Sequence, residues 1–171
     1  MFVETRRTIL RPLEPDDFDA MHALNSDADS MKYVGNNQPM PAHVTRAWIE
    51  ASARHHAAYG YGECAVRDRA SGEFIGWAGV FRSYDIKQPD EVEISYGLVP
   101  SRRGQGIASE IAAALVDYAF STLRMRRILA TIDPANIASI RVAKKLGFVL
   151  KETKPDEYGA DTLYLWKERG R

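Results

Sequence analysis

Hydrophobic and polar residues alternate along residues 91–99, and this period of two predicts a β-strand with two unlike faces. The apolar face is formed by Val92, Ile94, Tyr96 and Leu98. The opposite face carries the carboxylates of Glu91 and Glu93 and the hydroxyl of Ser95. Groups that can exchange protons are thus concentrated on one side of one strand, which makes that side the first candidate for a functional site.

Six further strands and four helices are predicted from the remaining pattern. The strands cover residues 8–13, 63–69, 73–84, 128–132, 148–154 and 162–167. The helices begin at Pro15, at Pro41 (ending near Gly60 or Gly62), after Gly106, and at Asn136, the last being stopped by Gly147. Ala70-Ser71-Gly72 has the length and composition of a hairpin turn. This order predicts an α/β fold with a mixed sheet of about six or seven strands, flanked by about four helices.

Length, charge and cysteine content exclude several classes of protein. The 171 residues predict one domain over residues 1–171, and 23 basic residues balance 23 acidic ones. A net charge of zero gives no general attraction for nucleic acid or anionic membranes, and no apolar run is long enough to predict a membrane span or a secretion signal. We therefore expect a cytoplasmic protein. Cys64 is the single cysteine, which excludes an internal disulfide and a Cys-rich metal site, and we expect no metal.

A glycine-containing turn lies between the strand at residues 91–99 and the following helix. Unpaired backbone N–H groups at a helix N-terminus bind anions, and Gly104 and Gly106 would let a ligand approach the backbone closely. The alternative is that these glycines only allow the chain to turn. Gly106 is not followed by the lysine of a nucleotide-hydrolysing loop. A dinucleotide-binding loop remains a distant alternative, because Ser109 replaces its third glycine and the preceding strand is not continuously apolar.

Several separated segments carry motifs. Arg103-Gly104-Gln105-Gly106-Ile107-Ala108 has an arginine, two residues, a glycine, one residue and an alanine. Residues 136–148 contain Asn-x-x-Ser followed by Lys-x-Gly-Phe. Together these motifs resemble those of the GNAT superfamily of acetyl-CoA-dependent N-acetyltransferases. Thr8-Ile9-Leu10-Arg11-Pro12-Leu13 and residues 93–100 are similar to its branch that acetylates the N-termini of ribosomal proteins, as in ribosomal-protein-alanine N-acetyltransferase.

The resemblance implies acetyl-CoA as cosubstrate and a set of residues that bind it. The backbone from Tyr96 to Val99, with a bulge at Gly97, would pair with the pantetheine arm, with the N–H of Leu98 or Val99 near the thioester oxygen. The pyrophosphate would be held by the amides of Gly104, Gln105, Gly106, Ile107, Ala108 and Ser109. Arg102 and Arg103 would add positive charge there, although such a pair is also common on a solvated surface.

Asn136 and Ser139 lie three residues apart and therefore share one helix face. By resemblance, Asn136 hydrogen-bonds the cofactor arm and Ser139 meets the sulfur. The alternative is that Asn136 is a plain N-cap and Ser139 an incidental first-turn residue. Many GNAT enzymes carry a tyrosine general acid four residues after this serine, whereas this chain has Ala143. Ser139 is therefore the candidate general acid, a modest task because a thiol with a pKa near 8.5 leaves readily as thiolate.

Glu93 is the candidate general base, acting directly or through water, and the alternative is a surface carboxylate on a half-exposed strand. One carboxylate suits an α-amine, whose pKa is about 8, better than a lysine, whose pKa is about 10.4. The resemblance implies acetyl transfer by direct attack in a ternary complex, and its ribosomal branch makes a protein N-terminal α-amine the favoured acceptor. Alternatives are a polyamine or aminoglycoside acceptor, a non-catalytic acyl-CoA-binding protein and, distantly, a dinucleotide-dependent oxidoreductase.

Other residues carry weaker expectations. Trp48, Trp77, Phe81 and Tyr84 are expected mainly in the core, while Tyr33, Trp77 and Tyr158 are candidates to line an acceptor cleft. Cys64 is expected to be a small buried apolar residue, because no His and Asn partners are identifiable by spacing. The expected assembly is a monomer or a homodimer.

Overall fold

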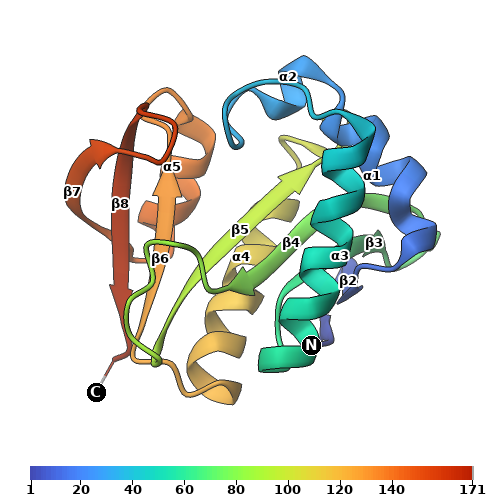
Figure 1. The fold of residues 1–171 in the computed structure, drawn as a ribbon. Coiled ribbons are helices and arrows are strands. Elements are labelled where there is room, and N and C mark those ends of the chain that lie inside the picture. The colour runs from blue at the N-terminus through green and yellow to red at the C-terminus, as the bar shows by residue number, and fades with distance from the viewer. Residues whose placement is uncertain (171) are drawn as a thin grey trace.

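Eight strands form one mixed sheet in the computed structural model, which describes residues 1–170 (Figure 1). The strands are β1 (Val3–Glu4), β2 (Thr8–Pro12), β3 (Glu63–Asp68), β4 (Phe74–Phe81), β5 (Glu91–Leu98), β6 (Arg127–Ile132), β7 (Val149–Pro155) and β8 (Asp161–Glu168). Their order across the sheet is β1-β2-β3-β4-β5-β6-β8-β7. Every neighbouring pair is antiparallel except β5 and β6, which run parallel.

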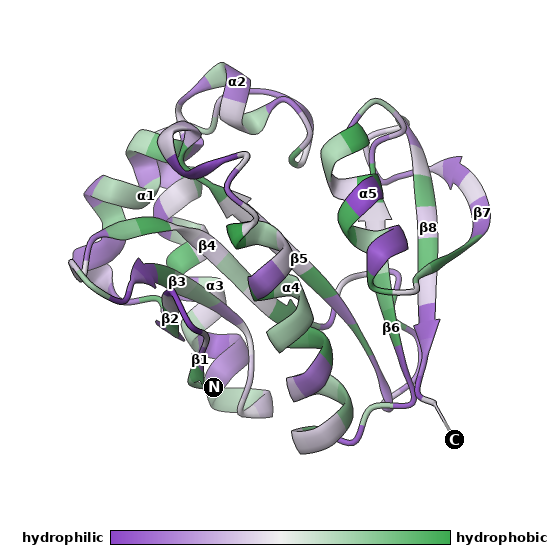
Figure 2. Cartoon of the chain, turned by 180° about the vertical axis from the view of Figure 1, so that it is seen from behind, coloured by the Kyte–Doolittle hydropathy of each residue, from purple (hydrophilic) through white to green (hydrophobic). Residues whose placement is uncertain are grey.

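Helices cover both faces of this sheet. They are α1 (Phe18–Asn25), α2 (Ala28–Met31), α3 (Ala42–Tyr59), α4 (Ile107–Asp117) and α5 (Ile137–Lys145). α1 and α3 pack on one face around a core that includes Ile49 and Trp77, whereas α4 and α5 pack on the other, around Ile111 and Leu115. Figure 2 shows the α4 face, where the hydrophobic side of α4 is turned toward the sheet. No helix in the described part of the chain is both long and apolar enough to cross a membrane.

The parallel pair β5–β6 opens partway along its length. Only Glu91, Val92 and Glu93 of β5 pair with β6, while the antiparallel pairing of β5 with β4 continues from Glu93 to Leu98. Beyond Glu93 the two strands diverge, as Figure 1 shows. The edge of β5 from Ile94 to Leu98 therefore has backbone groups without a neighbouring strand on the β6 side, and a ligand can pair with them.

The α/β class and the mixed sheet with helices on its faces are confirmed. The structure adds the short elements β1 and α2 to the predicted set. The expected bulge at Gly97 is wrong, because β4 and β5 keep one register throughout, and the irregularities lie in the β3–β4 and β7–β8 pairings. Gly97 has a packing role instead: a Cβ there would come within 2.7 Å of the Trp77 indole.

Candidate active site

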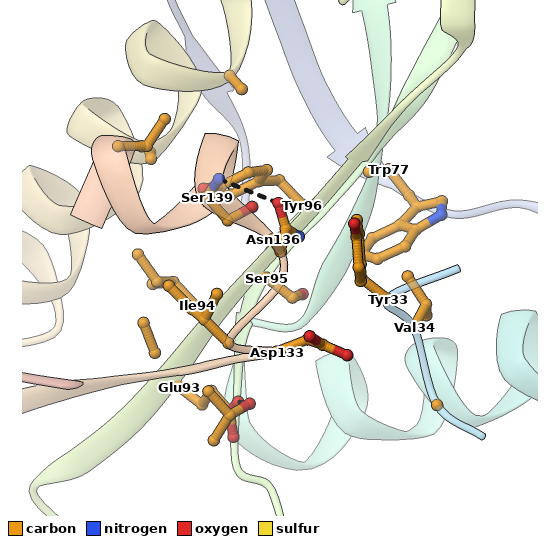
Figure 3. A pocket seen from close by; sticks show the side chains of 18 of the residues that line it. Tyr33, Val34, Trp77, Glu93, Ile94, Ser95, Tyr96, Asp133, Asn136 and Ser139 are labelled. Carbon is orange, nitrogen blue, oxygen red and sulfur yellow. Dashed lines mark hydrogen bonds between the residues drawn. The ribbon is translucent and has the colours of Figure 1, made fainter. Parts of the chain in front are cut away.

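A cavity of about 1160 Å³ lies where β5 and β6 diverge. It is lined by the end of β5, the N-terminus of α4, the start of α5 and the segment around α2 (Figure 3). Ligand pockets commonly measure roughly 300–1,000 Å³, so this cavity has room for a large ligand and a second molecule beside it. Of the predicted site residues, Glu93, Leu98, Arg103, Gly104, Gly106, Ile107, Ala108, Ser109, Asn136 and Ser139 line it.

The loop before α4 has the geometry of an anion site. Gly104 and Gly106 have φ values of 71° and 76°, in the left-handed region that favours glycine. Gly106 occupies the N-cap position of α4 with no side chain to cap the helix. The N–H groups of Ile107, Ala108 and Ser109 in the first turn lack helical partners, and they add to the positive end of the helix dipole. These residues fit a diphosphate, which supports the expected place of the coenzyme A pyrophosphate.

Arginines hold this loop in place. Arg103 donates from Nε to the Leu98 carbonyl at 2.9 Å, and its other nitrogens contact Asp29 and Ser30 of α2. Arg102 forms ion pairs with Asp68 and Glu73. Both guanidinium groups are thus engaged with protein groups, so the structure gives Arg103 a role in tying the end of β5 to the α2 segment.

One predicted cofactor contact, the N–H of Val99, is corrected. The N–H of Val99 donates to the Ile75 carbonyl at 3.0 Å, and Val99 does not line the cavity. Backbone N–H groups alternate in direction along a strand, so Leu98 points its N–H toward the diverging β6 side. The Gln105 side chain donates to the Ser101 carbonyl and its own carbonyl accepts from Arg7, so its backbone N–H stays a predicted contact of the pyrophosphate. Of the two predicted donors to the thioester oxygen, only the N–H of Leu98 therefore remains a candidate.

Asn136 and Ser139 face the cavity from the start of α5 (Figure 3). The Asn136 side-chain oxygen accepts from the Ser139 backbone N–H at 3.1 Å, so Asn136 is an N-cap, and its amide hydrogens are left for a ligand. Tyr96 extends from β5 toward Ser139. Burial raises the pKa of the Tyr96 phenol, and hydrogen bonding to Ser139 opposes part of that rise. Ala143 of α5 stands where many GNAT enzymes carry a tyrosine. In this chain a tyrosine from another element, Tyr96 of β5, lies beside Ser139.

Glu93 is only 5% exposed, so the alternative of a surface carboxylate is wrong. It lies at the last paired position of β5 and β6, and the Thr131 hydroxyl donates to it. Burial raises its pKa to about 7, and the hydrogen bond from Thr131 limits the rise. A carboxyl group whose pKa is near the working pH is suited to accept a proton and release it again.

Sequence reasoning missed Glu63, at the start of β3. Its carboxylate lines the same cavity and accepts hydrogen bonds from the Ser95 hydroxyl at 2.7 Å and from the Trp48 indole. Burial raises the pKa of Glu63. The signal was the Ser95 position on the polar face of β5, but the partner is 32 residues away in sequence and only the sheet register brings the two together.

The aromatic predictions have different outcomes. Tyr33, Trp77 and Tyr158 all line the cavity, as expected for a cleft. Tyr84 also lines it but is 81% exposed, so its expected core position is wrong. Cys64 is buried, and burial raises the pKa of its thiol to about 12, which agrees with a structural role.

Comparisons with known proteins identify the family of this chain. Residues 7–149 match the family model of the acetyltransferase (GNAT) domain. The chain is 33% identical over 150 residues to the uncharacterized protein YkkB of Bacillus subtilis (strain 168), covering 87% of this chain and 86% of that protein. It is 27% identical over 155 residues to the spermidine N(1)-acetyltransferase of Escherichia coli (strain K12), covering 91% of this chain and 80% of that one.

Solved structures share the fold. A GNAT-family acetyltransferase from Bacillus anthracis superposes with a TM-score of 0.83 and 25% identity, covering 98% of each chain. RimL, a ribosomal L7/L12 alpha-N-protein acetyltransferase solved in complex with coenzyme A, superposes with a TM-score of 0.80 and 21% identity over 98% of each chain. The family match, the diverging strands and the open α4 N-terminus agree with one another. The chain therefore belongs to the GNAT family of acetyltransferases and is an N-acetyltransferase.

Proposed function

We propose that this N-acetyltransferase transfers the acetyl group of acetyl-CoA directly to a primary amine bound in the same cavity, without a covalent enzyme intermediate. The observation that carries the proposal is Glu93, a buried carboxyl group with a pKa of about 7 that shares one cavity with the open N-terminus of α4. One group can take up a proton, while the other can hold a diphosphate. Both requirements of the transfer are met within one space.

The proposed reaction begins when Glu93 removes a proton from the acceptor ammonium, directly or through water. The neutral nitrogen attacks the thioester carbonyl carbon, and the Leu98 N–H donates to the oxygen as negative charge develops there. The carbon–sulfur bond then breaks, and the nitrogen releases its second proton to water. Ser139, beside which Tyr96 lies, passes a proton to the leaving sulfur and takes one back from water, so its hydroxyl is restored. The products are the N-acetylated amine and coenzyme A, and Glu93 returns its proton to water.

The favoured acceptor remains a protein N-terminal α-amine. An ammonium with a pKa of about 8 needs only modest assistance, which a carboxylate with a pKa of about 7 can give. The fold shared with RimL is compatible with this acceptor. A small-molecule amine is the second candidate, because the cavity contains a second buried carboxyl group, Glu63, that has no part in the proposed reaction steps. This carboxyl group could bind another positive charge of a small amine. The sequence similarity to spermidine N(1)-acetyltransferase supports this candidate.

Acetyl-CoA is expected to raise the melting temperature more than any nicotinamide nucleotide, because a ligand at about a thousand times its Kd adds roughly 4 kcal/mol to the free energy of unfolding. Coenzyme A release should follow when peptides with free N-termini or small amines are added. Thermal unfolding and a thiol-detection assay measure the two effects. Protection by acetyl-CoA without thiol release across the amine panel would instead indicate a non-catalytic acyl-CoA-binding protein.

Ser139→Ala is expected to lower kcat about tenfold while leaving the Kd for acetyl-CoA nearly unchanged, because one hydrogen bond to a charged group contributes roughly 1.5 kcal/mol. The effect is modest because the thiolate is a good leaving group. Steady-state kinetics and calorimetric titration separate the two quantities. Ser121→Ala is the matched control, because Ser121 lies just after α4 and outside the cavity. Its hydroxyl is exposed and donates to Asp117 at the end of α4. Wild-type kcat in the Ser139 variant would remove this residue from the mechanism.

A further inference from the structure

Four acidic side chains are buried in the part of the chain that the structure describes, and they fall into two pairs. Asp17 and Glu91 lie outside the cavity, and each contacts two arginine guanidinium groups at 2.5–2.8 Å. These arginines are Arg11 and Arg67 on Asp17, and Arg126 and Arg127 on Glu91. The arginines thus offset the cost of burying these two negatively charged carboxylates, which lie where no ligand is expected.

Glu63 and Glu93 form the second pair, and both line the cavity. Within residues 1–170, no lysine, arginine or histidine forms an ion pair with either carboxylate. Glu63 is 9% exposed and accepts only the neutral donors Ser95 and Trp48. An ionised carboxylate in such surroundings is stabilised by a cation that arrives from outside the protein. In the proposed reaction Glu93 receives the reacting ammonium, so Glu63 would still lack a cation.

The surroundings of Glu63 are suited to an organic cation. Trp48 and Trp77 both line the cavity, with ring centroids 5.0 Å apart and planes inclined by 56°. Trp48 also holds the Glu63 carboxylate through its indole N–H. Indole faces attract ammonium groups, most strongly where water is excluded. A carboxylate with no cation of its own and a pair of indoles therefore occur together on the acceptor side of the cavity.

We infer that Glu63, Ser95, Trp48 and Trp77 form a subsite for a second positively charged group of the acceptor. Among small-molecule amines, the second candidate class, diamines and polyamines are therefore preferred over monoamines. This inference rests on the proposed function, in which Glu93 receives the reacting nitrogen. Ser95 follows Glu93 by two residues on the same strand face, a separation of about 7 Å. Because Glu63 is hydrogen-bonded to Ser95, a short carbon chain is sufficient to connect an ammonium at Glu63 with a nitrogen at Glu93.

The test compares kcat/KM for diaminobutane and diaminopentane with kcat/KM for butylamine and pentylamine, which have the same chain lengths but one charge. For the wild-type protein, the diamine-to-monoamine ratio is expected to be at least about ten, the value of one charged hydrogen bond. Glu63→Gln keeps the size of the side chain and removes its charge, and it should bring the ratio close to one. Glu50→Gln is the matched control, because Glu50 is exposed on α3 and lies outside the cavity, and it should keep the wild-type ratio.

The possible failures are distinguishable. If the wild-type protein acetylates no amine, the proposed function fails first. If it acetylates amines but shows a ratio near one, or if Glu63→Gln keeps the wild-type ratio, the second subsite is disproved while the proposed function stands. Should Glu63→Gln not fold, Glu63→Asp provides a second measurement. The shorter side chain moves the carboxylate away from Glu93, so the preferred diamine should become longer, and an unchanged length preference would contradict the subsite.

Discussion

Replacing Glu93 with glutamine is expected to lower kcat/KM for amine acceptors by about 10²- to 10⁴-fold, the usual contribution of a positioned general base. Glutamine has nearly the same shape as glutamate and can still accept the hydrogen bond from Thr131, but it cannot take up a proton. The affinity for acetyl-CoA should change little, because Glu93 lies on β5 beyond the edge that would pair with pantetheine. Initial-rate kinetics with a fixed acceptor and calorimetric titration with acetyl-CoA measure the two effects.

The pH dependence gives this prediction a second readout. Burial raises the pKa of Glu93 to about 7, so the carboxyl group is protonated below that pH and cannot act as a base. The wild-type kcat/KM should therefore fall as pH decreases through about 7, and Glu93→Gln should lose that limb. Thr131→Val should shift the limb to higher pH, because the hydrogen bond from Thr131 lowers the pKa of Glu93.

The control for Glu93→Gln is Glu50→Gln, which changes an exposed carboxylate on α3 and should keep both the rate and the pH profile. Circular dichroism and thermal unfolding establish that each variant is folded. A Glu93→Gln protein with the wild-type rate would show that another group, or solvent alone, takes up the proton.

Much of the fold was predictable because its signals are local. The left-handed Gly60 ends α3 at the predicted place, and Ala70-Ser71-Gly72 joins β3 and β4 as a hairpin. β1 and α2 were missed because they contain two and four residues, too few for any hydrophobic period to be recognised. The divergence of β5 and β6 was also beyond the pattern of one strand, since it depends on where the parallel pairing stops.

The candidate site divides in the same way. Gly104 and Gly106 could be singled out because they precede the start of a helix, where local sequence determines the backbone. Asn136 and Ser139 were assigned by their resemblance to the GNAT motif, because a helix start alone predicts only an N-cap. The direction of an N–H group along β5 was not predictable, because it depends on the register with β4, and the sequence therefore left Leu98 and Val99 as alternatives. Glu63 was missed for a related reason: its partner Ser95 is brought to it by two strand pairings.

The second large effect is expected at Gly106, where valine should weaken acetyl-CoA binding by about a hundredfold or more. The residue has a φ of 76°, and it is the N-cap of α4, beside the N–H groups that would hold the pyrophosphate. A branched side chain here disfavours this backbone conformation and covers the space in front of those N–H groups. Losing two hydrogen bonds to a charged group, at roughly 1.5 kcal/mol each, corresponds to about this change in Kd.

Gly72→Val separates the effect on binding from the effect of backbone strain. Gly72 has a φ of 74° and, like Gly106, little around it that a Cβ would meet, but it lies in the β3–β4 turn outside the cavity. Valine should therefore cost both variants a similar ~1–2 kcal/mol of folding stability, because both positions are left-handed. Only Gly106→Val should lose affinity for acetyl-CoA in a calorimetric titration. Equal affinities in the two variants would mean that the diphosphate binds elsewhere than at the N-terminus of α4.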